Sequence, residues 1–324
     1  MNVVIFKSLR KIHRIFGKNG DWNSENLVEV RNQEANELVY NKIRDALING
    51  KGLMVCKFGT IELRAFCCLD GVKKGFTARD YLEGIEEKQC VLPEEAMAAL
   101  CNNAGFFPND VKYGLKFRDI MELDMQEIDI LGSYIKQEEQ IKEYLPECTR
   151  INLNGYYAPF LWKHPWTRIL EGKRVLVVHP FADSIEKQYK KRIYLFDDPE
   201  VLPEFKSLTT IKAVQSIAGN GTQTGFKDWF EALQWMENEI DSKEYDIALI
   251  GCGAYGFSLA AHVKRQGKIA VHLAGWTQML FGIYGNRWIE DQPEFKKYVN
   301  EFWVRPAESE KPDGVKSVEN ACYW

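Results

Sequence analysis

The sequence predicts an α/β fold with a mostly parallel sheet and helices on both faces. From about residue 150 onward, short apolar segments alternate with segments of helical periodicity. Apolar runs of about four to eight residues are typical of strands buried inside a sheet. Strands that alternate with helices favour right-handed crossovers and parallel pairing. The chain has 324 residues, of which 45% are hydrophobic, so a packed core is expected.

The first part of the chain predicts a helix, a strand and a second helix. Residues 24–48 show helical periodicity and end at the stop signal Asn49-Gly50. The run GLMVCKFG (52–59) is short, apolar and closed by glycine, which indicates a buried strand followed by a turn. The segment TIELRAFCCLDG (60–71) follows it directly and is typical of a helix.

The middle of the chain, residues 78–148, is rich in helix formers and poor in β-branched residues. We interpret this stretch as a helical insertion in the sheet domain. Helices are expected over 94–105, 110–123 and 132–145, and a short strand over 127–131.

The second half of the chain supplies most of the alternation. Strands are expected over residues 173–181, 208–216, 245–251 and 268–275. Helices are expected over 182–191, 225–241 and 257–267. We therefore divide the chain into a basic segment at 1–20, one domain at 24–305 and a polar tail at 306–324.

Charge and cysteine usage exclude several classes of protein. The formal net charge of −4 argues against nucleic-acid binding through a basic surface. The 8 cysteines contain no C-x-x-C pair, so neither a zinc motif nor a redox motif is indicated. We expect reduced thiols and a cytoplasmic location, because the chain is large and shows no secretory signal.

Residues 1–18 form a basic segment with helical periodicity. It holds five cations before the first acid: Lys7, Arg10, Lys11, Arg14 and Lys18. Such a helix can lie on an anionic membrane surface, and packing of its apolar side on the domain is the alternative. No run approaches the ~18–20 apolar residues that span a bilayer. A membrane contact would therefore be peripheral, on the inner face.

A glycine turn, GCGAYG (251–256), has the spelling G-x-G-x-x-G of a dinucleotide-binding turn. A predicted strand precedes it and a predicted helix follows, so glycine backbone and free N–H groups can approach an anion there. A dinucleotide site also needs an acid about 20 residues later. The next strand instead ends in His272 and Gly275. The turn therefore favours a phosphate other than that of NAD, and a packing turn without ligand is the alternative.

Other polar residues follow the ends of separate predicted strands. His179 closes one strand, Lys57 and Glu62 follow another, and Gln278 follows the strand that holds His272. The carboxyl ends of parallel strands meet at one edge of a sheet, where open α/β folds bind their ligands. A lysine, two histidines, glycine N–H groups and one carboxylate there suit an anion, with a divalent metal as a further ligand of the carboxylate.

Three segments resemble those of a known family. KFGTIEL (57–63) resembles the R-F-G-D-x-E-L segment of GT-D-type glycosyltransferases, bacterial enzymes of surface polysaccharide and glycoprotein assembly. The stretch 250–288 is similar to a longer signature of their relatives, with a glycine turn, a K-x-A-x-H-x-G strand and a Q-x-L-F-G-x-x-G-x-R-W segment. VVHPFADSIEKQY (177–189) is also similar. The resemblance covers roughly 30–70 and 170–290.

This resemblance implies a Rossmann-like fold, a nucleotide-sugar donor that is commonly a UDP-sugar, and a divalent metal (Mn or Mg) held by an acidic D-x-E pair. Glu62 matches the second acid, while Thr60 stands in place of the first and Lys57 replaces the arginine. Glu62 is thus the implied metal ligand, and Glu62 or His179 the candidate base. The donor-binding candidates are Lys57, Gly59, Thr60, Gly251, Gly253, Tyr255, Gly256, His272, Gly275, Gln278 and Arg287.

The acceptor implied is a cell-surface polysaccharide, a glycolipid or other lipid-linked precursor, or a glycoprotein. Two other functions stay open. The glycine turn also suits another Rossmann-type enzyme, such as an S-adenosylmethionine-dependent methyltransferase, although the acid after the next strand is missing for that cofactor as well. Thr60 leaves room for a non-catalytic protein that binds a sugar nucleotide. Trp276 and Trp288 are either sugar platforms or core residues.

Overall fold

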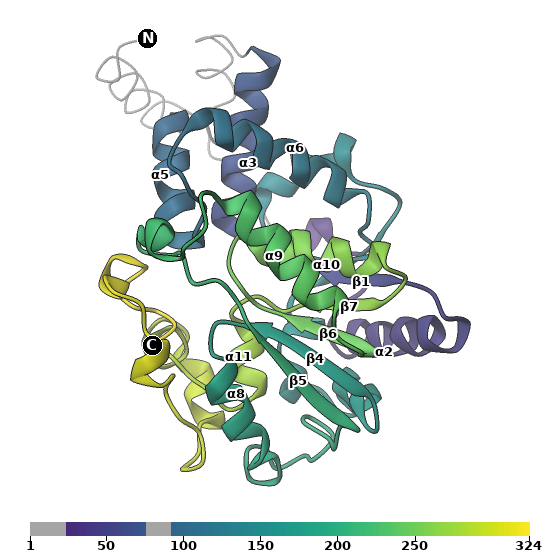
Figure 1. Ribbon diagram of the computed structural model, residues 1–324. Coiled ribbons are helices and arrows are strands. Elements are labelled where there is room, and N and C mark those ends of the chain that lie inside the picture. Colours follow the sequence, from purple (N-terminus) through teal and green to yellow (C-terminus); the bar gives the residue numbers. More distant parts are fainter. Residues whose placement is uncertain (1–23, 76–91) are drawn as a thin grey trace.

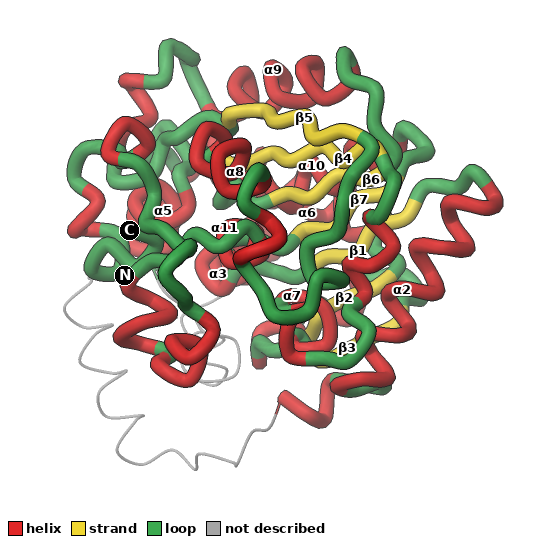
Figure 2. Tube along the Cα trace, turned by 90° about the horizontal axis from the view of Figure 1, so that it is seen from below, coloured by secondary structure: helices red, strands yellow, loops and turns green. Residues whose placement is uncertain are grey.

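The computed structural model of the chain describes residues 24–75 and 92–324. It contains a parallel seven-stranded sheet in the order β3-β2-β1-β7-β6-β4-β5 (Figure 1, Figure 2). The strands are β1 (Leu53–Cys56), β2 (Ile130–Ser133), β3 (Thr149–Asn152), β4 (Arg174–His179), β5 (Ser207–Lys212), β6 (Ile247–Ile250) and β7 (Ile269–His272). The predicted α/β class is confirmed. The basic segment at 1–20 lies outside the described residues.

Helices cover both faces of this sheet. The larger ones are α2 (Asn32–Asn49), α3 (Thr60–Lys74), α5 (Pro93–Ala104), α6 (Val111–Met125), α8 (Ala182–Tyr189), α9 (Trp229–Asp241) and α10 (Tyr255–Arg265), and two short ones are α7 (Asn154–Tyr157) and α11 (Trp276–Leu280). One core lies under α3, α5, α6, α9 and α10, and the other under α2, α7, α8 and α11. Successive residues of β1 alternate between the two cores, as the pleat of a strand requires.

Local signals set several helix ends. Gly50 closes α2 with a φ of 60°, as the Asn49-Gly50 signal predicted. The helix expected from residue 225 begins instead at Trp229, because the Asp228 carboxylate accepts the Glu231 N–H at 2.9 Å and caps it there.

The middle of the chain is only partly as predicted. α5 and α6 confirm the helices over 94–105 and 110–123, but the helix expected over 132–145 is wrong. β2 runs to Ser133, and two 3-10 turns follow at Lys136–Glu139 and Lys142–Tyr144. The Glu138 carboxylate accepts the N–H groups of both Tyr134 and Ile135, so these amides are satisfied without a helix. The described part of 78–148 is therefore part of the sheet's own topology: residues 92–129 connect β1 to β2, residues 130–133 form β2, and residues 134–148 connect β2 to β3.

The connections between strands open a crevice at the carboxyl edge of the sheet. The chain leaves β1 and β6 toward the first face, through α3 and α10. It leaves β4 and β7 toward the opposite face, through α8 and α11. In the order β1-β7-β6-β4, neighbouring strands thus send the chain to alternating faces, which is where open α/β sheets bind ligands.

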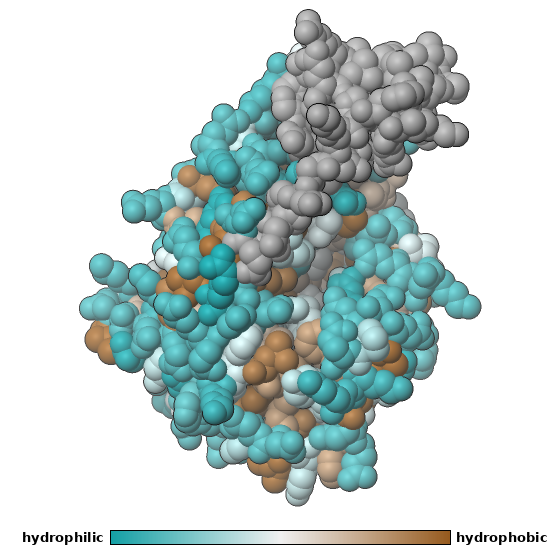
Figure 3. Space-filling model, turned by 180° about the vertical axis from the view of Figure 1, so that it is seen from behind, coloured by the Kyte–Doolittle hydropathy of each residue, from teal (hydrophilic) through white to brown (hydrophobic). Residues whose placement is uncertain are grey.

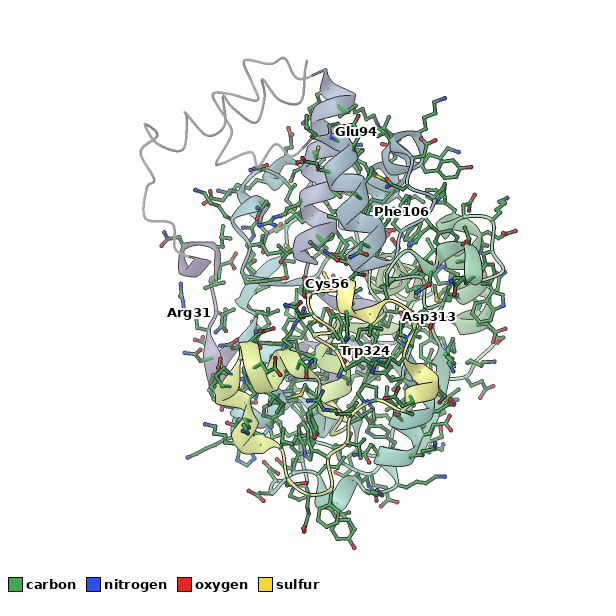
Figure 4. All side chains as sticks on the ribbon, turned by 90° about the vertical axis from the view of Figure 1, so that its left-hand side faces the viewer. Arg31, Cys56, Glu94, Phe106, Asp313 and Trp324 are labelled. Atoms are coloured by element: carbon green, nitrogen blue, oxygen red, sulfur yellow. The ribbon has the colours of Figure 1, made fainter. Side chains whose placement is uncertain are left out.

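The segment 305–324 turns back over this edge instead of forming a loose tail. The backbone N–H of Asn286 donates to the Trp324 carbonyl at 3.1 Å, and that of Arg287 to the Cys322 carbonyl at 2.8 Å. Figure 4 looks onto the edge and shows the yellow C-terminal segment across it, with Trp324 below Cys56, the last residue of β1. Segment 305–324 is therefore a wall of the crevice.

Hydrophilic residues cover most of the face seen in Figure 3, and apolar residues gather in a narrow central strip. Within residues 24–75 and 92–324, no helix has both the length and the apolar character needed to cross a bilayer.

Candidate functional site

A single cleft at the carboxyl edge gathers nearly all the predicted site residues. Its volume is about 990 Å³, including the space that opens to solvent. Residues that follow β1, β2, β4, β5, β6 and β7 line it, together with the end of α5 and segment 305–324. The predicted residues on its walls are Lys57, Gly59, Thr60, Glu62, His179, Gly251, Gly253, Tyr255, His272, Gly275, Gln278 and Arg287. Among the residues predicted to bind the donor, Gly256 alone does not line the cleft.

Glu62 lies in the first turn of α3, at the end of the cleft near β1. Its carboxylate folds back over Gly59, so close that a Cβ there would stand 1.9 Å from Oε2 and would displace the carboxylate. Burial raises the pKa of the Glu62 carboxyl, and the positive charges of Lys57 and Arg287 offset part of that rise. Glu62 is thus a carboxylate whose protonation is shifted toward neutral pH, which suits a general base.

Tyr134 contacts the residues that follow β1, although no motif in the sequence indicated it. Its hydroxyl donates to the Phe58 carbonyl at 3.0 Å and lies 3.2 Å from Lys57 Nζ and 3.3 Å from Thr60 Oγ1. Thr60 therefore spends its hydrogen bond on a protein partner. Tyr134 directly follows β2, so the strand-end rule would have identified it had β2 been placed correctly.

His179 is neutral and arranged as a donor. Its Nδ1 accepts the N–H of Phe181 at 3.0 Å, and burial lowers its pKa to about 3. This hydrogen bond assigns the remaining proton of the ring to Nε2. An imidazole with a proton on the free nitrogen can donate to a ligand but cannot accept a proton there. The geometry favours Glu62 over His179 as the base.

His272 and Gly256 form a packed pair. A Cβ at Gly256 would stand 2.5 Å from His272 Nε2, so the third glycine of the turn makes room for this ring. The sequence predicted that Gly256 contacts the nucleotide-sugar donor, but the structure gives it this packing role instead. His272 is 3% exposed, burial lowers its pKa to about 3, and neither ring nitrogen has a hydrogen-bond partner within residues 24–75 and 92–324.

The other two glycines of the turn also have packing reasons. A Cβ at Gly251 would stand 2.2 Å from the Ala274 carbonyl oxygen, and one at Gly253, where φ is 58°, would stand 2.6 Å from that of Ala104. The Gly251 N–H is already bonded to Val178. The N–H groups of Cys252 and Gly253 find no acceptor in the described part of the chain. These two N–H groups, at the start of α10, are the ones an anion can reach.

Three residues that were predicted to bind the nucleotide-sugar donor contact segment 305–324 instead. The Gln278 amide donates to the Tyr323 carbonyl at 3.2 Å, and a Cβ at Gly275 would stand 2.5 Å from the Tyr323 ring. Arg287 donates to the Tyr323 hydroxyl at 3.1 Å and pairs with Glu319. These residues shape the wall of the cleft, and the charge of the Arg287 guanidinium also lowers the pKa of Glu62.

Three aromatic candidates belong mainly to the core. The Tyr255 hydroxyl lies 3.0 Å from Ser216 Oγ, and its ring stacks on Trp229. Trp276 and Trp288 are buried in the second core, and neither lines the cleft. Neither tryptophan is therefore placed as a sugar platform.

The opposite end of the cleft, near β5, carries uncharged amides. Asn103, at the end of α5, and Gln215, after β5, line it beside Val214 and Ile217. Asn103 Oδ1 accepts from Asn102, while its amide nitrogen and the whole Gln215 amide have no protein partner in the described residues. Neither residue was predicted as part of the site. α5 matches no motif, and Gln215 was expected inside a strand over 208–216, whereas β5 ends at Lys212.

The residues present fit a divalent metal poorly. Within the described chain, no three His, Cys, Asp or Glu side chains gather as a metal site would require. Glu62 faces two cations, Glu319 is paired with Arg287, and the Thr60 hydroxyl is bonded to Tyr134. One carboxylate is left as a ligand, so no step is derived through a metal.

No protein-family model, curated protein or solved structure matches this chain.

Proposed function

We propose that the protein is a glycosyltransferase that moves a sugar from a nucleotide-sugar donor, a UDP-sugar by resemblance, to a surface polysaccharide, glycolipid or glycoprotein. The supporting observation is the order of groups along one cleft. Cations lie near β1, free N–H groups lie near β6, and uncharged amides lie near β5. Four strand spacings separate β1 from β5, about 19 Å. That length suits a diphosphate at the β1 end and a nucleoside that extends from it toward β5.

In this proposal each group has a role in the transfer. The bond between the anomeric carbon of the sugar and the diphosphate oxygen breaks, and its electron pair leaves with the nucleoside diphosphate. The oxygen of an acceptor hydroxyl forms the new bond to that carbon, and the Glu62 carboxylate takes the hydroxyl proton. Lys57, Arg287 and the N–H groups of Cys252 and Gly253 stabilise the leaving diphosphate.

We place the reaction in the cytoplasm, at the inner face of the membrane where a lipid-linked acceptor is presented. The support is the basic segment 1–18, which precedes the described domain. Deletion of residues 2–18 should move the protein from the membrane fraction to the soluble fraction. Unchanged partitioning would reject this placement.

The test of the function is release of nucleotide from a panel of nucleotide sugars, with and without extracts that contain acceptors. We expect one donor to be consumed faster when acceptor is present. Glu62→Gln should abolish that acceleration, whereas Glu34→Gln, on an exposed position of α2, should not change it. Absence of release from every donor, together with no thermal shift on addition of UDP, would reject the proposal.

A second candidate is a non-catalytic protein that binds a sugar nucleotide. The observation that favours it is at Thr60, which stands in place of the first acid of the D-x-E pair and whose hydroxyl is bonded to Tyr134. In that case Glu62→Gln would bind UDP and preserve cellular function. The methyltransferase alternative rested on the glycine turn, and packing now accounts for all three of its glycines.

A further inference from the structure

Two cations from different elements line the end of the cleft that holds Glu62. Lys57 follows β1, and Arg287 belongs to the segment after α11. Both line the cleft and both act electrostatically on Glu62. The proposed diphosphate would therefore meet positive charge supplied by the protein on two sides.

The same region offers few ligands to a divalent cation. Hard cations such as Mg²⁺ prefer about six oxygen ligands, with carboxylates as the usual protein donors. His179 uses one ring nitrogen as an acceptor and has its proton on the other, and both ring nitrogens of His272 are buried. Glu62 is the carboxylate left, and a dication beside it would be repelled by the two neighbouring cations.

Each cation is held so that it retains donors for a ligand. Lys57 Nζ has the Tyr134 hydroxyl at 3.2 Å, which accounts for one of its three N–H groups. The Arg287 guanidinium lies over the Tyr323 ring, 4.5 Å from its centre, which fixes its plane. These contacts orient the two charges before a ligand arrives.

Glu319 occupies one side of Arg287 as an internal anion. Its carboxylate pairs with Arg287 Nη2, and its side chain is 45% exposed. Glu319, Asn320 and Ala321 all have positive φ, at 45°, 56° and 61°. A carboxylate that reaches solvent can leave Arg287 for water when a stronger anion binds.

We infer that Lys57 and Arg287 bind the diphosphate directly, that no divalent cation is needed for this binding, and that the diphosphate displaces Glu319 from Arg287. The identity of the ligand rests on the proposed function. In this arrangement the two side chains, and not a metal ion, neutralise the negative charge of the donor's diphosphate.

The experiment measures binding of inorganic pyrophosphate and of UDP to the full chain by calorimetry, once in EDTA and once in MnCl₂. We expect the Kd of each probe to differ by less than about threefold between the two conditions. In EDTA, Lys57→Met should weaken both probes at least about tenfold, and the matched control Lys112→Met, an exposed lysine of α6, should not. Glu319→Gln should tighten binding, because the competing anion is gone.

Arg287 also holds segment 305–324, so a loss of binding in Arg287→Met has two causes to separate. Binding by Arg287→Met is therefore compared with binding by Arg287→Lys, which keeps the charge, and thermal melts are measured for both variants. Binding that appears only with Mn²⁺ would overturn the inference and leave the glycosyltransferase proposal standing. Binding of pyrophosphate but not of UDP in EDTA would support the inference and reject the UDP donor. Binding of neither probe under either condition would overturn both proposals.

Discussion

The ring of His272 lies against Gly256, so close that a Cβ on Gly256 would stand 2.5 Å from Nε2. This contact joins His272, at the end of β7 and on the wall of the cleft, to the first turn of α10 behind it. It also explains the third glycine of a motif whose spelling indicates a nucleotide site. Packing within the protein sets the geometry of the turn, and a ligand can bind the N–H groups that this packing leaves without an acceptor.

Gly256→Ala should therefore destabilise the fold. The added methyl group must push the buried ring away, and overpacking of this kind costs about 1–3 kcal/mol. Urea denaturation would measure the loss in the free energy of unfolding. Gly256→Ala combined with His272→Ala should show a smaller loss than the sum of the two single variants. Strict additivity would mean that the contact is not the cause.

The two buried histidines should make the fold sensitive to acid. Burial lowers the pKa of His179 and of His272 to about 3, whereas an unfolded histidine titrates near 6.5. Between pH ~6.5 and ~3 the unfolded chain binds more protons, so the free energy of unfolding falls as pH falls. Each histidine adds a slope of up to ~1.4 kcal/mol per pH unit.

Urea denaturation at several pH values would check this. His272→Gln, which replaces the imidazole with a neutral amide, should show a shallower decline below pH ~6.5 than the unmodified chain. An equally steep decline in the variant would contradict the assignment for His272.

Glu62 should titrate in the activity profile. Because burial raises the pKa of its carboxyl above 4.5, a base at this position loses activity as pH falls through that raised value. The raised pKa also means that ionisation of this carboxyl costs free energy in the folded state. The free energy of unfolding therefore falls as the pH rises from the pKa of Glu62 in the unfolded chain to its pKa in the folded chain. Glu62→Gln should thus be at least as stable as the unmodified chain at pH 7, while transfer falls about 10²-fold or more. A variant that loses stability together with activity would contradict this account.

Tyr134→Phe should disturb the cleft near β1. It removes the hydroxyl shared by the Phe58 carbonyl, Lys57 and Thr60, at a cost of about 1 kcal/mol in the free energy of unfolding. Lys57 then loses its orientation, so UDP should bind more weakly. Tyr113→Phe is the control, since no hydrogen bond of the Tyr113 hydroxyl is recorded in the described structure. Equal UDP affinity in both variants would contradict the role of Tyr134.

The sequence predicted β1, β4, β5, β6 and β7, placed β2 only in part, and missed β3. β1, β4, β6 and β7 are apolar runs, which periodicity detects. β3 has the sequence TRIN and two half-buried residues at the sheet edge, so it lacks that signal. The stretch 132–145 has helix-forming composition, but the Glu138 carboxylate and the pairing of β2 override it.

The site was predictable where it follows such strands. Lys57, Glu62, His179 and His272 lie at recognisable strand ends and share one cleft. Asn103 could not be placed from sequence, since α5 reaches the cleft only through long-range contacts, such as that of the Ala254 N–H with the Ala104 carbonyl. The packing reasons for the three glycines were equally hidden, because they depend on which atoms approach from other elements.

The most direct test of the central claim is a crystal structure of the full chain with UDP. The account predicts the diphosphate at the carboxyl edge, with oxygens about 3 Å from Lys57 Nζ and from the Gly253 N–H. It also predicts that the uracil ring lies beside Asn103 and Gln215. UDP bound outside this cleft, or with its diphosphate away from Lys57, would contradict it.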